Sequence, residues 1–154
     1  MIVELATLGE EAQEFKGEEP SEVFDLGSTE DVRSSGPLKY RLSVSLAGDE
    51  LVARGVVRAD FLFLCGRCAE FFVLTVADSR FMAVLECPNK NESVDLTPEM
   101  RESIILAFPT SPLCNSDCRG LCPLCGTNLN KSECKCGPSS SGGQWDVLKN
   151  LKLE

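Results

Sequence analysis

The sequence predicts a mainly β protein, an antiparallel sheet or partly open barrel with one helix and a C-terminal four-cysteine zinc ribbon. Three observations support this fold class. The middle of the chain alternates apolar and polar residues, one segment carries helix start and stop signals, and close cysteine pairs gather in the last third. We divide the 154 residues into a β body over 1–112, a zinc ribbon over 113–137 packed on that body, and a linker and tail over 138–154.

The N-terminal third gives the weaker strand signals. Residues 2–7 predict a short strand, and the acidic, Gly- and Pro-containing residues 9–22 predict a loop or weak edge structure. The apolar residues of 23–26 predict a returning strand.

Residues 38–47 give the clearest strand, because every second residue from Leu38 to Leu46 is apolar or aromatic. Gly48-Asp49 is a hairpin signal, and the β-rich run 51–64 contains Gly55, where we expect a bulge. The runs 71–76 and 81–86 continue an antiparallel meander.

One helix is predicted at about residues 97–108. Thr97 is the candidate N-cap, Pro98 the first helical residue, and Pro109 and Pro112 end the segment. Its apolar side chains are Met100, Ile104, Leu106 and Phe108. After a Ser/Gly linker over 138–143, residues 144–154 predict a short terminal helix.

The composition excludes several classes of function. The chain has no histidine, which removes Ser-His and Cys-His catalysis and a His-bound catalytic zinc. The first residues lack a basic and then apolar export signal, and no stretch reaches the length of a membrane span, so we expect a cytoplasmic protein.

The net charge of −9 is unevenly distributed. Residues 1–31 hold ten carboxylates and one lysine, whereas acids and bases balance in the remainder. We therefore expect the N-terminal face to avoid phosphate and to attract a basic partner. The low-ranked candidate contacts for a partner are Glu10, Glu11, Glu14, Glu18 and Glu19 in this segment, and Arg119, Lys131 and Lys135 beside the cysteines.

Eight of the nine cysteines form four close pairs: Cys65/Cys68, Cys114/Cys118, Cys122/Cys125 and Cys134/Cys136. Two thiolates at such spacing can face one tetrahedral zinc ion, so four pairs predict two four-cysteine sites and two zinc ions per chain, with iron as the alternative metal. Cys122, Cys125, Cys134 and Cys136 would form the ribbon site. Cys65 and Cys68, at a hairpin tip, would be completed by Cys114 and Cys118. Cys87 is left as a buried free thiol.

Two other chemistries compete with structural zinc. Thioredoxin-like redox activity needs Cys-x-x-Cys at the start of a helix, but a strand-like run follows Cys68. Iron is the stronger alternative, because four thiolates also hold iron and the 122–126 sequence Cys-Pro-Leu-Cys-Gly is similar to a rubredoxin knuckle.

The cysteine strings also carry a family resemblance. These strings are residues 112–130 (PLCNSDCRGLCPLCGTNLN), Cys134-Lys135-Cys136, Cys65-Gly66-Arg67-Cys68, and the end from Trp145. Together they resemble the bacterial YceD family, or large ribosomal RNA subunit accumulation protein, which also has plastid relatives. The resemblance implies a role in the accumulation, processing or stability of large-subunit rRNA.

The sequence and the resemblance together predict a non-catalytic zinc protein that acts in ribosome biogenesis by binding. The expected partner is a large-subunit precursor, through a basic ribosomal protein or rRNA, with no membrane and no small-molecule substrate. Direct binding of rRNA by the zinc ribbon and a rubredoxin-like iron electron carrier remain the alternatives.

Overall fold

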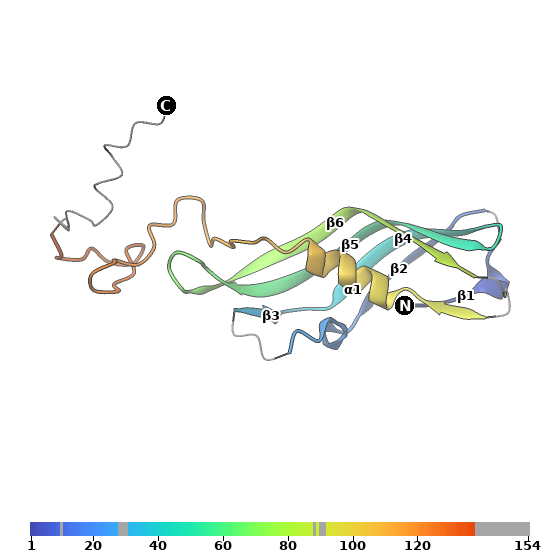
Figure 1. Cartoon of the computed structure of the whole chain (residues 1–154), viewed down its shortest axis with the longest axis horizontal. Coiled ribbons are helices and arrows are strands. Elements are labelled where there is room, and N and C mark those ends of the chain that lie inside the picture. The colour runs from blue at the N-terminus through green and yellow to red at the C-terminus, as the bar shows by residue number, and fades with distance from the viewer. Residues whose placement is uncertain (10, 28–30, 88, 90–91, 138–154) are drawn as a thin grey trace, which may run out of the picture.

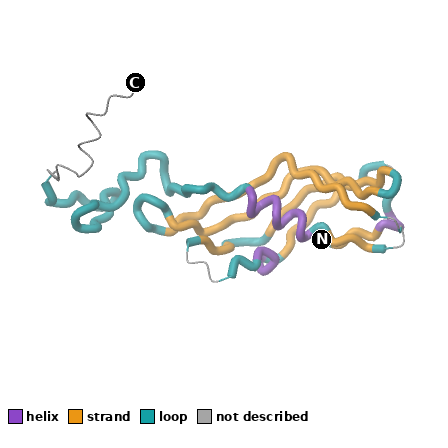
Figure 2. Tube along the Cα trace, viewed as in Figure 1, coloured by secondary structure: helices purple, strands orange, loops and turns teal. Residues whose placement is uncertain are grey.

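The computed structural model describes residues 1–9, 11–27, 31–87, 89 and 92–137. The elements follow the order β1 (Ile2–Glu4), η1 (Leu5–Thr7), β2 (Gln13–Glu19), η2 (Ser21–Phe24), β3 (Val32–Ser34), β4 (Leu38–Ala47), β5 (Glu50–Leu64), β6 (Phe71–Glu86), β7 (Ser93–Asp95) and α1 (Thr97–Leu106). The mainly β, antiparallel fold class with one α-helix is confirmed (Figures 1 and 2).

Strands β5 and β6 form a long hairpin that organises the sheet. β5 pairs with β6 along one side, and on its other side with β4 at residues 50–58 and with β3 at residues 61–63. β2 adds to the far side of β4, and β1 pairs separately with β7. All of these pairings are antiparallel, so each connection can be short.

The core lies on one face of this sheet, under α1 and η2. Leu38, Leu42 and Val44 of β4 are fully buried there, as are Met100 and Ile104 of α1. The Phe24 ring from η2 packs edge-on against Phe61 at 4.8 Å, and Phe108 does the same from beyond α1. We call the opposite face of the sheet, which α1 does not cover, the outer face (Figure 1).

The period-two prediction for residues 38–47 is confirmed, because β4 has those bounds and its alternate residues turn inward. The Gly48-Asp49 turn joins β4 to β5, and the register shifts between Gly55 and Val57 as a bulge requires. Residues 71–86 form one strand rather than two, since β6 follows β5 over almost its whole length.

Two local predictions are wrong. Residues 23–26 are not a strand: residues 21–24 form a 3-10 turn after Pro20, which buries Phe24 beneath the sheet. The first strand ends at Glu4 instead of residue 7. The acidic segment, predicted as a loop or weak edge structure, contains the seven-residue edge strand β2, because pairing with β4 overrides its poor strand composition.

The helix begins differently from the prediction. Leu96 occupies the N-cap position and Thr97 is already helical, so Thr97 is not the cap. The Asp95 carboxylate instead accepts hydrogen bonds from the Thr97 amide at 2.9 Å and the Thr97 hydroxyl at 2.6 Å. Leu106 is 77 % exposed, so it does not belong to the buried face of the helix.

The cysteine-rich residues 113–137 extend past the β5–β6 turn at one end of the sheet (Figure 1). They are irregular, with one isolated bridge between Leu121 and Asn128. The expected terminal helix at 144–154 and the linker lie outside the described residues. Among the described residues, no helix is long and apolar enough to cross a membrane.

Candidate metal centre

The first cysteine pair lies in the turn between β5 and β6. The Cys65 amide donates to the Glu70 carbonyl at 2.9 Å, and the Ala69 amide donates to the Cys65 carbonyl at the same distance. Ala69 takes a left-handed backbone conformation with φ of 53°. This tight turn brings Cys65 and Cys68 to the same tip, as the sequence predicts.

The second pair is brought to that tip by the chain that follows α1. The Pro112 carbonyl accepts a hydrogen bond from the Gly66 amide at 3.0 Å. The Cys114 amide points at the Cys65 sulfur, 3.4 Å away. Arg67 then fixes the next turn, because its guanidinium donates to the carbonyls of Ser116 at 3.2 Å and Cys118 at 3.1 Å.

The four sulfurs of Cys65, Cys68, Cys114 and Cys118, which we call the hairpin cluster, lie within 4.8 Å of one another. The Cys65 and Cys118 sulfurs are 3.9 Å apart, and those of Cys68 and Cys114 are 3.7 Å apart. A disulfide would need about 2.05 Å. Zinc–sulfur bonds of about 2.3 Å place tetrahedral sulfurs about 3.8 Å apart, so this donor set fits a tetrahedral metal ion.

The sulfurs of Cys122, Cys125, Cys134 and Cys136, the ribbon cluster, also lie within 4.8 Å of one another. Its first half is a knuckle: the Gly126 amide donates to the Cys122 carbonyl at 2.9 Å, and the Cys122 amide to the Thr127 carbonyl at 2.8 Å. Gly126 has φ of 71°, a conformation that glycine adopts without strain. The structure therefore groups the eight cysteines into the two sets that the sequence predicts.

Asn130 connects the two clusters. It lies in the loop of the ribbon cluster, but its side-chain amide donates to the Cys118 sulfur of the hairpin cluster at 3.2 Å. Its side-chain oxygen accepts a hydrogen bond from the Arg119 amide at 2.8 Å. The Leu121 amide adds a bond to the Arg67 carbonyl at 3.0 Å. In the sequence Asn130 is only a polar residue between Cys125 and Cys134, and Arg67 only a residue between two cysteines, so no local pattern signals these contacts.

The thiols of the hairpin cluster have divergent proton affinities. Burial raises the pKa of Cys65, but backbone hydrogen bonds from Cys114, Cys68 and Arg67 outweigh it and lower the pKa to about 6. Partial loss of solvent around the Cys114 sulfur and hydrogen bonding to the other thiols raise the pKa of Cys114 to about 12. Four thiolates this close repel one another, so a cation is needed before all four can lose their protons.

The ribbon cluster shows the same division. Hydrogen bonds from the Thr127 hydroxyl and amide lower the pKa of Cys125 to about 6. A hydrogen bond with Cys125, together with partial loss of solvent and the negative charge of the Cys125 thiolate, raises the pKa of Cys136 to about 12. Cys125 and Cys136 are exposed, whereas the hairpin cluster has only Cys114 exposed. The ribbon cluster is therefore the more accessible of the two.

The candidate acidic contacts do not form one continuous strip. Glu14 and Glu18 project from alternate positions of β2, on the same side as Lys16, and Glu11 is exposed before the strand. Glu19 is turned to the other side, where it pairs with the Met1 amino group at 2.7 Å. Glu10 lies outside the described residues.

The three basic candidates near the cysteines are also separated by their contacts. Lys131 forms an ion pair with Glu70, a residue that also accepts a hydrogen bond from Asn128 at 3.1 Å. Arg119 and Lys135 are exposed. Cys87 is 4 % exposed and its thiol donates to the Leu85 carbonyl at 3.4 Å, which agrees with a buried thiol.

Comparison with known proteins supports the family resemblance. Residues 81–152 match the family described as large ribosomal RNA subunit accumulation protein YceD. The chain is 32 % identical over 68 residues to the chloroplastic YCED homolog 1 of Arabidopsis thaliana, covering 44 % of this chain and 21 % of the relative. It is 37 % identical over 60 residues to the corresponding Zea mays protein, covering 38 % of this chain and 20 % of the relative.

A bacterial relative covers more of the chain. An uncharacterized protein of Mycobacterium leprae is 30 % identical over 107 residues, which is 60 % of this chain and 49 % of the relative. The chain thus spans about a fifth of the plant relatives and about half of the mycobacterial one. No solved structure matches. The comparisons therefore confirm a resemblance to the YceD family over residues 81–152, a range that holds the cysteine strings from residue 112 onward but not Cys65 and Cys68.

Proposed function

We propose that the protein supports the accumulation of large-subunit ribosomal RNA as a non-catalytic binding factor with two structural zinc ions. The observation that carries the proposal is the pair of four-cysteine groups, found in a chain whose relatives are named for this role. Such a role places the protein in the compartment where large subunits assemble. Its partner would be a large-subunit precursor, through its rRNA or a basic ribosomal protein.

The donor sets favour a structural role for the metal. Four cysteine ligands fill the coordination sphere of zinc and leave no position for a water or substrate. A metal ion bound by the hairpin cluster would cross-link the β5–β6 turn to the residues after α1. A second ion in the ribbon cluster would fix residues 122–136 beside it. Apart from those cross-links, the hydrogen bonds of Arg67 and Asn130 hold the segment in place.

Depletion of the protein in its own organism tests the proposed function. We expect the ratio of mature large-subunit to small-subunit rRNA to fall and to recover with the wild-type gene. Cys118→Ser, which removes a buried ligand of the hairpin cluster, should restore it poorly, whereas Cys87→Ser should restore it fully. An unchanged rRNA ratio after depletion would refute the proposal.

Elemental analysis of the full chain, purified without added metal, tests the cofactor. About two zinc ions per chain are expected from the two clusters. A red protein with iron as the dominant metal would instead support the electron-carrier alternative.

A further inference from the structure

The outer face of the sheet is rich in basic side chains at its centre. On β4, the inward residues Leu38 and Leu42 alternate with exposed Lys39 and Arg41. On β5, exposed Arg58 lies between buried Val57 and Ala59. Lys16 of β2 is exposed and lies opposite Arg41 in the register of β2 with β4. The one lysine of the acidic N-terminal segment thus joins three cations from the β body.

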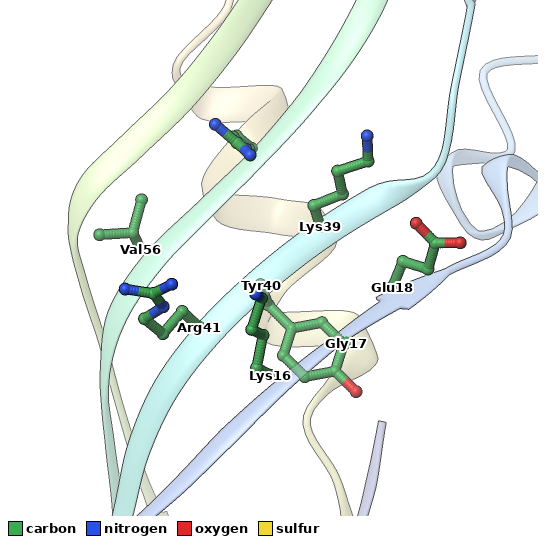
Figure 3. A pocket seen from close by; sticks show the side chains of 8 residues that line it. Lys16, Gly17, Glu18, Lys39, Tyr40, Arg41 and Val56 are labelled. Carbon is green, nitrogen blue, oxygen red and sulfur yellow. The ribbon is translucent and has the colours of Figure 1, made fainter.

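These side chains surround a shallow hollow of about 560 Å³ in the sheet (Figure 3). Its lining, which we call the cationic hollow, consists of Lys16, Gly17, Glu18, Lys39, Tyr40, Arg41, Val56 and Arg58. Four cations and one carboxylate give it a net charge of three positive units, in a chain whose overall charge is −9. In Figure 3 the labelled basic side chains lie in front of the strands, with α1 behind.

The cations are arranged in unfavourable cross-strand pairs. Lys16 lies opposite Arg41 in the β2–β4 register, and Lys39 lies opposite Arg58 in the β4–β5 register. Like charges directly opposite one another destabilise a sheet. Within the described part of the chain, no ion pair joins any of these four side chains to a carboxylate, although Glu18 lies opposite Lys39. An external anion would relieve this repulsion.

The bulge beside Arg41 shapes the same region. Gly55 has φ of 157°, and a Cβ atom placed there would lie 2.1 Å from the Arg41 carbonyl oxygen. The backbone of β5 therefore approaches β4 more closely than a residue with a side chain permits. The register with β6 shifts beside it, because β6 has two residues between the partners of Gly55 and Val57 where β5 has only Val56. A bulge increases the local twist, and Val56 lies opposite Arg41 in the lining of the hollow.

We infer that the cationic hollow binds the phosphate backbone of RNA in the large-subunit precursor, an assignment that rests on the proposed function. Several unpaired cations on neighbouring strands match a chain of closely spaced phosphates. Tyr40 is the only aromatic residue of the lining, and it faces the Gly17 side of β2, where its ring leaves no room for a Cβ atom. The hollow therefore contacts backbone rather than stacked bases and has little sequence preference.

The acidic remainder of the chain does not prevent this contact. Exposed charges are screened beyond about 8 Å at physiological ionic strength. The local sign of the outer face then decides whether phosphate is bound, so on this inference Lys16 contacts phosphate although it belongs to the acidic N-terminal segment.

Binding of a fluorescent single-stranded RNA oligonucleotide to the full-length, metal-loaded protein tests the inference. The test variant is Arg41→Gln/Arg58→Gln, and Arg41→Lys/Arg58→Lys keeps the charge. The matched control is Lys149→Gln/Lys152→Gln, which removes the same two units of charge at residues that do not line the hollow. Circular dichroism and metal content should be unchanged in all three.

The wild-type affinity should fall as salt rises, with a logarithmic slope near −3 for about four phosphate contacts on single-stranded RNA. The test variant should bind about twentyfold more weakly at 0.1 M salt. Its logarithmic salt slope should be shallower by about 1.4, because two phosphate contacts are lost. The lysine variant and the matched control should stay within about twofold of wild type.

Equal binding by the test variant and the matched control overturns the assignment of the hollow, and the proposed function still stands on the depletion experiment. Wild-type protein that binds no RNA, but binds an acidic peptide through Arg41 and Arg58, also overturns it and makes the surface a protein-docking site. An unchanged rRNA ratio after depletion, combined with RNA binding that depends on Arg41 and Arg58, refutes the proposed function alone.

Discussion

At the scale of single residues, Gly55 has the least room for a side chain among the glycines in the described part of the chain. An added Cβ atom would meet the Arg41 carbonyl at 2.1 Å, and that atom is backbone, which cannot rotate away. We predict that Gly55→Ala destabilises the protein by about 1–3 kcal/mol, the usual cost of a strained backbone conformation. Urea unfolding followed by circular dichroism measures this.

Gly48→Ala is the matched comparison for Gly55→Ala. Gly48 also has a positive φ, 67°, but nothing lies within 4 Å of its Cβ position. Gly48→Ala should therefore lower the free energy of unfolding by less, because only the positive φ disfavours alanine there. Equal losses for the two variants would show that close approach of β5 to β4 is not what requires glycine at the bulge.

Asn130 is the residue whose role depends most on its three-dimensional position. Its side-chain amide donates a hydrogen bond to the Cys118 sulfur, which stabilises the thiolate form of Cys118. This bond lowers the pKa of Cys118 by more than burial raises it, so the pKa lies below the ordinary value of a thiol. We predict that Asn130→Ala weakens metal binding at the hairpin cluster by about 10–100-fold, as is usual for partners of metal ligands. Competition with a colorimetric chelator gives the affinity.

Lys131→Ala is the control for Asn130→Ala. Lys131 is the next residue of the loop, and its side chain pairs with the Glu70 carboxylate rather than with a sulfur. Its loss should leave metal affinity nearly unchanged. A similar loss in both variants would mean that the shape of the loop, rather than the bond to sulfur, supports the metal.

At the scale of elements, Asp95 holds the start of α1 against the end of β7. Burial raises its pKa, but hydrogen bonds from the Thr97 hydroxyl and amide outweigh burial, so the pKa is lower than that of an ordinary aspartate. We predict that Asp95→Ala lowers the free energy of unfolding at pH 7 by about 0.5–2 kcal/mol, the range for a lost helix cap.

The pH dependence follows from the direction of the pKa shift. A carboxyl with a lowered folded pKa stabilises the protein above its unfolded pKa of about 3.9, and this stability is lost as pH falls through the folded pKa. The difference between wild type and Asp95→Ala should therefore shrink below about pH 4. Unfolding at pH 7 and pH 3 measures it, and a difference that grows on acidification would contradict the account.

At the scale of the whole molecule, the protein combines two parts that are stabilised in different ways. The β body buries a continuous apolar core between the sheet, α1 and η2. Residues 113–137 bury little beyond their cysteines: Cys118 and Cys122 are buried, whereas Leu121 and Leu124 are exposed. We therefore expect metal ligation to be the main source of order in that segment.

Chelation should separate the two parts. Structural zinc contributes about 10–16 kcal/mol in small modules, as much as the about 5–15 kcal/mol of a whole domain. We predict that a strong chelator abolishes hydrogen-exchange protection at the amides of Cys118, Cys122 and Gly126, while β4 and β5 stay protected. Exchange followed by mass spectrometry checks this, and unchanged protection after the metal is removed would refute a metal-dependent fold.

The sequence by itself determined the features that depend on local pattern. Alternation over residues 38–47 gave β4 with its bounds and its buried face, because side chains of a strand point to opposite sides in turn. Gly55 marked the bulge, since few other residues fit that backbone. The spacing of the cysteines also predicted both four-sulfur groups. Two cysteines a few residues apart can face one metal ion, so four such pairs make two groups of four.

Only the tertiary structure decided the features that depend on neighbours distant in sequence. Residues 13–19 form a strand because β4 offers a free edge, and residues 21–24 form a turn because Phe24 has a place beneath Phe61. Summed by segment, the charges suggested an acidic face and a neutral body. Strand register instead brings Lys16 against Arg41 and Lys39 against Arg58. A period of two predicts which face a side chain takes, but hydrogen-bond register across strands selects the side chains beside it.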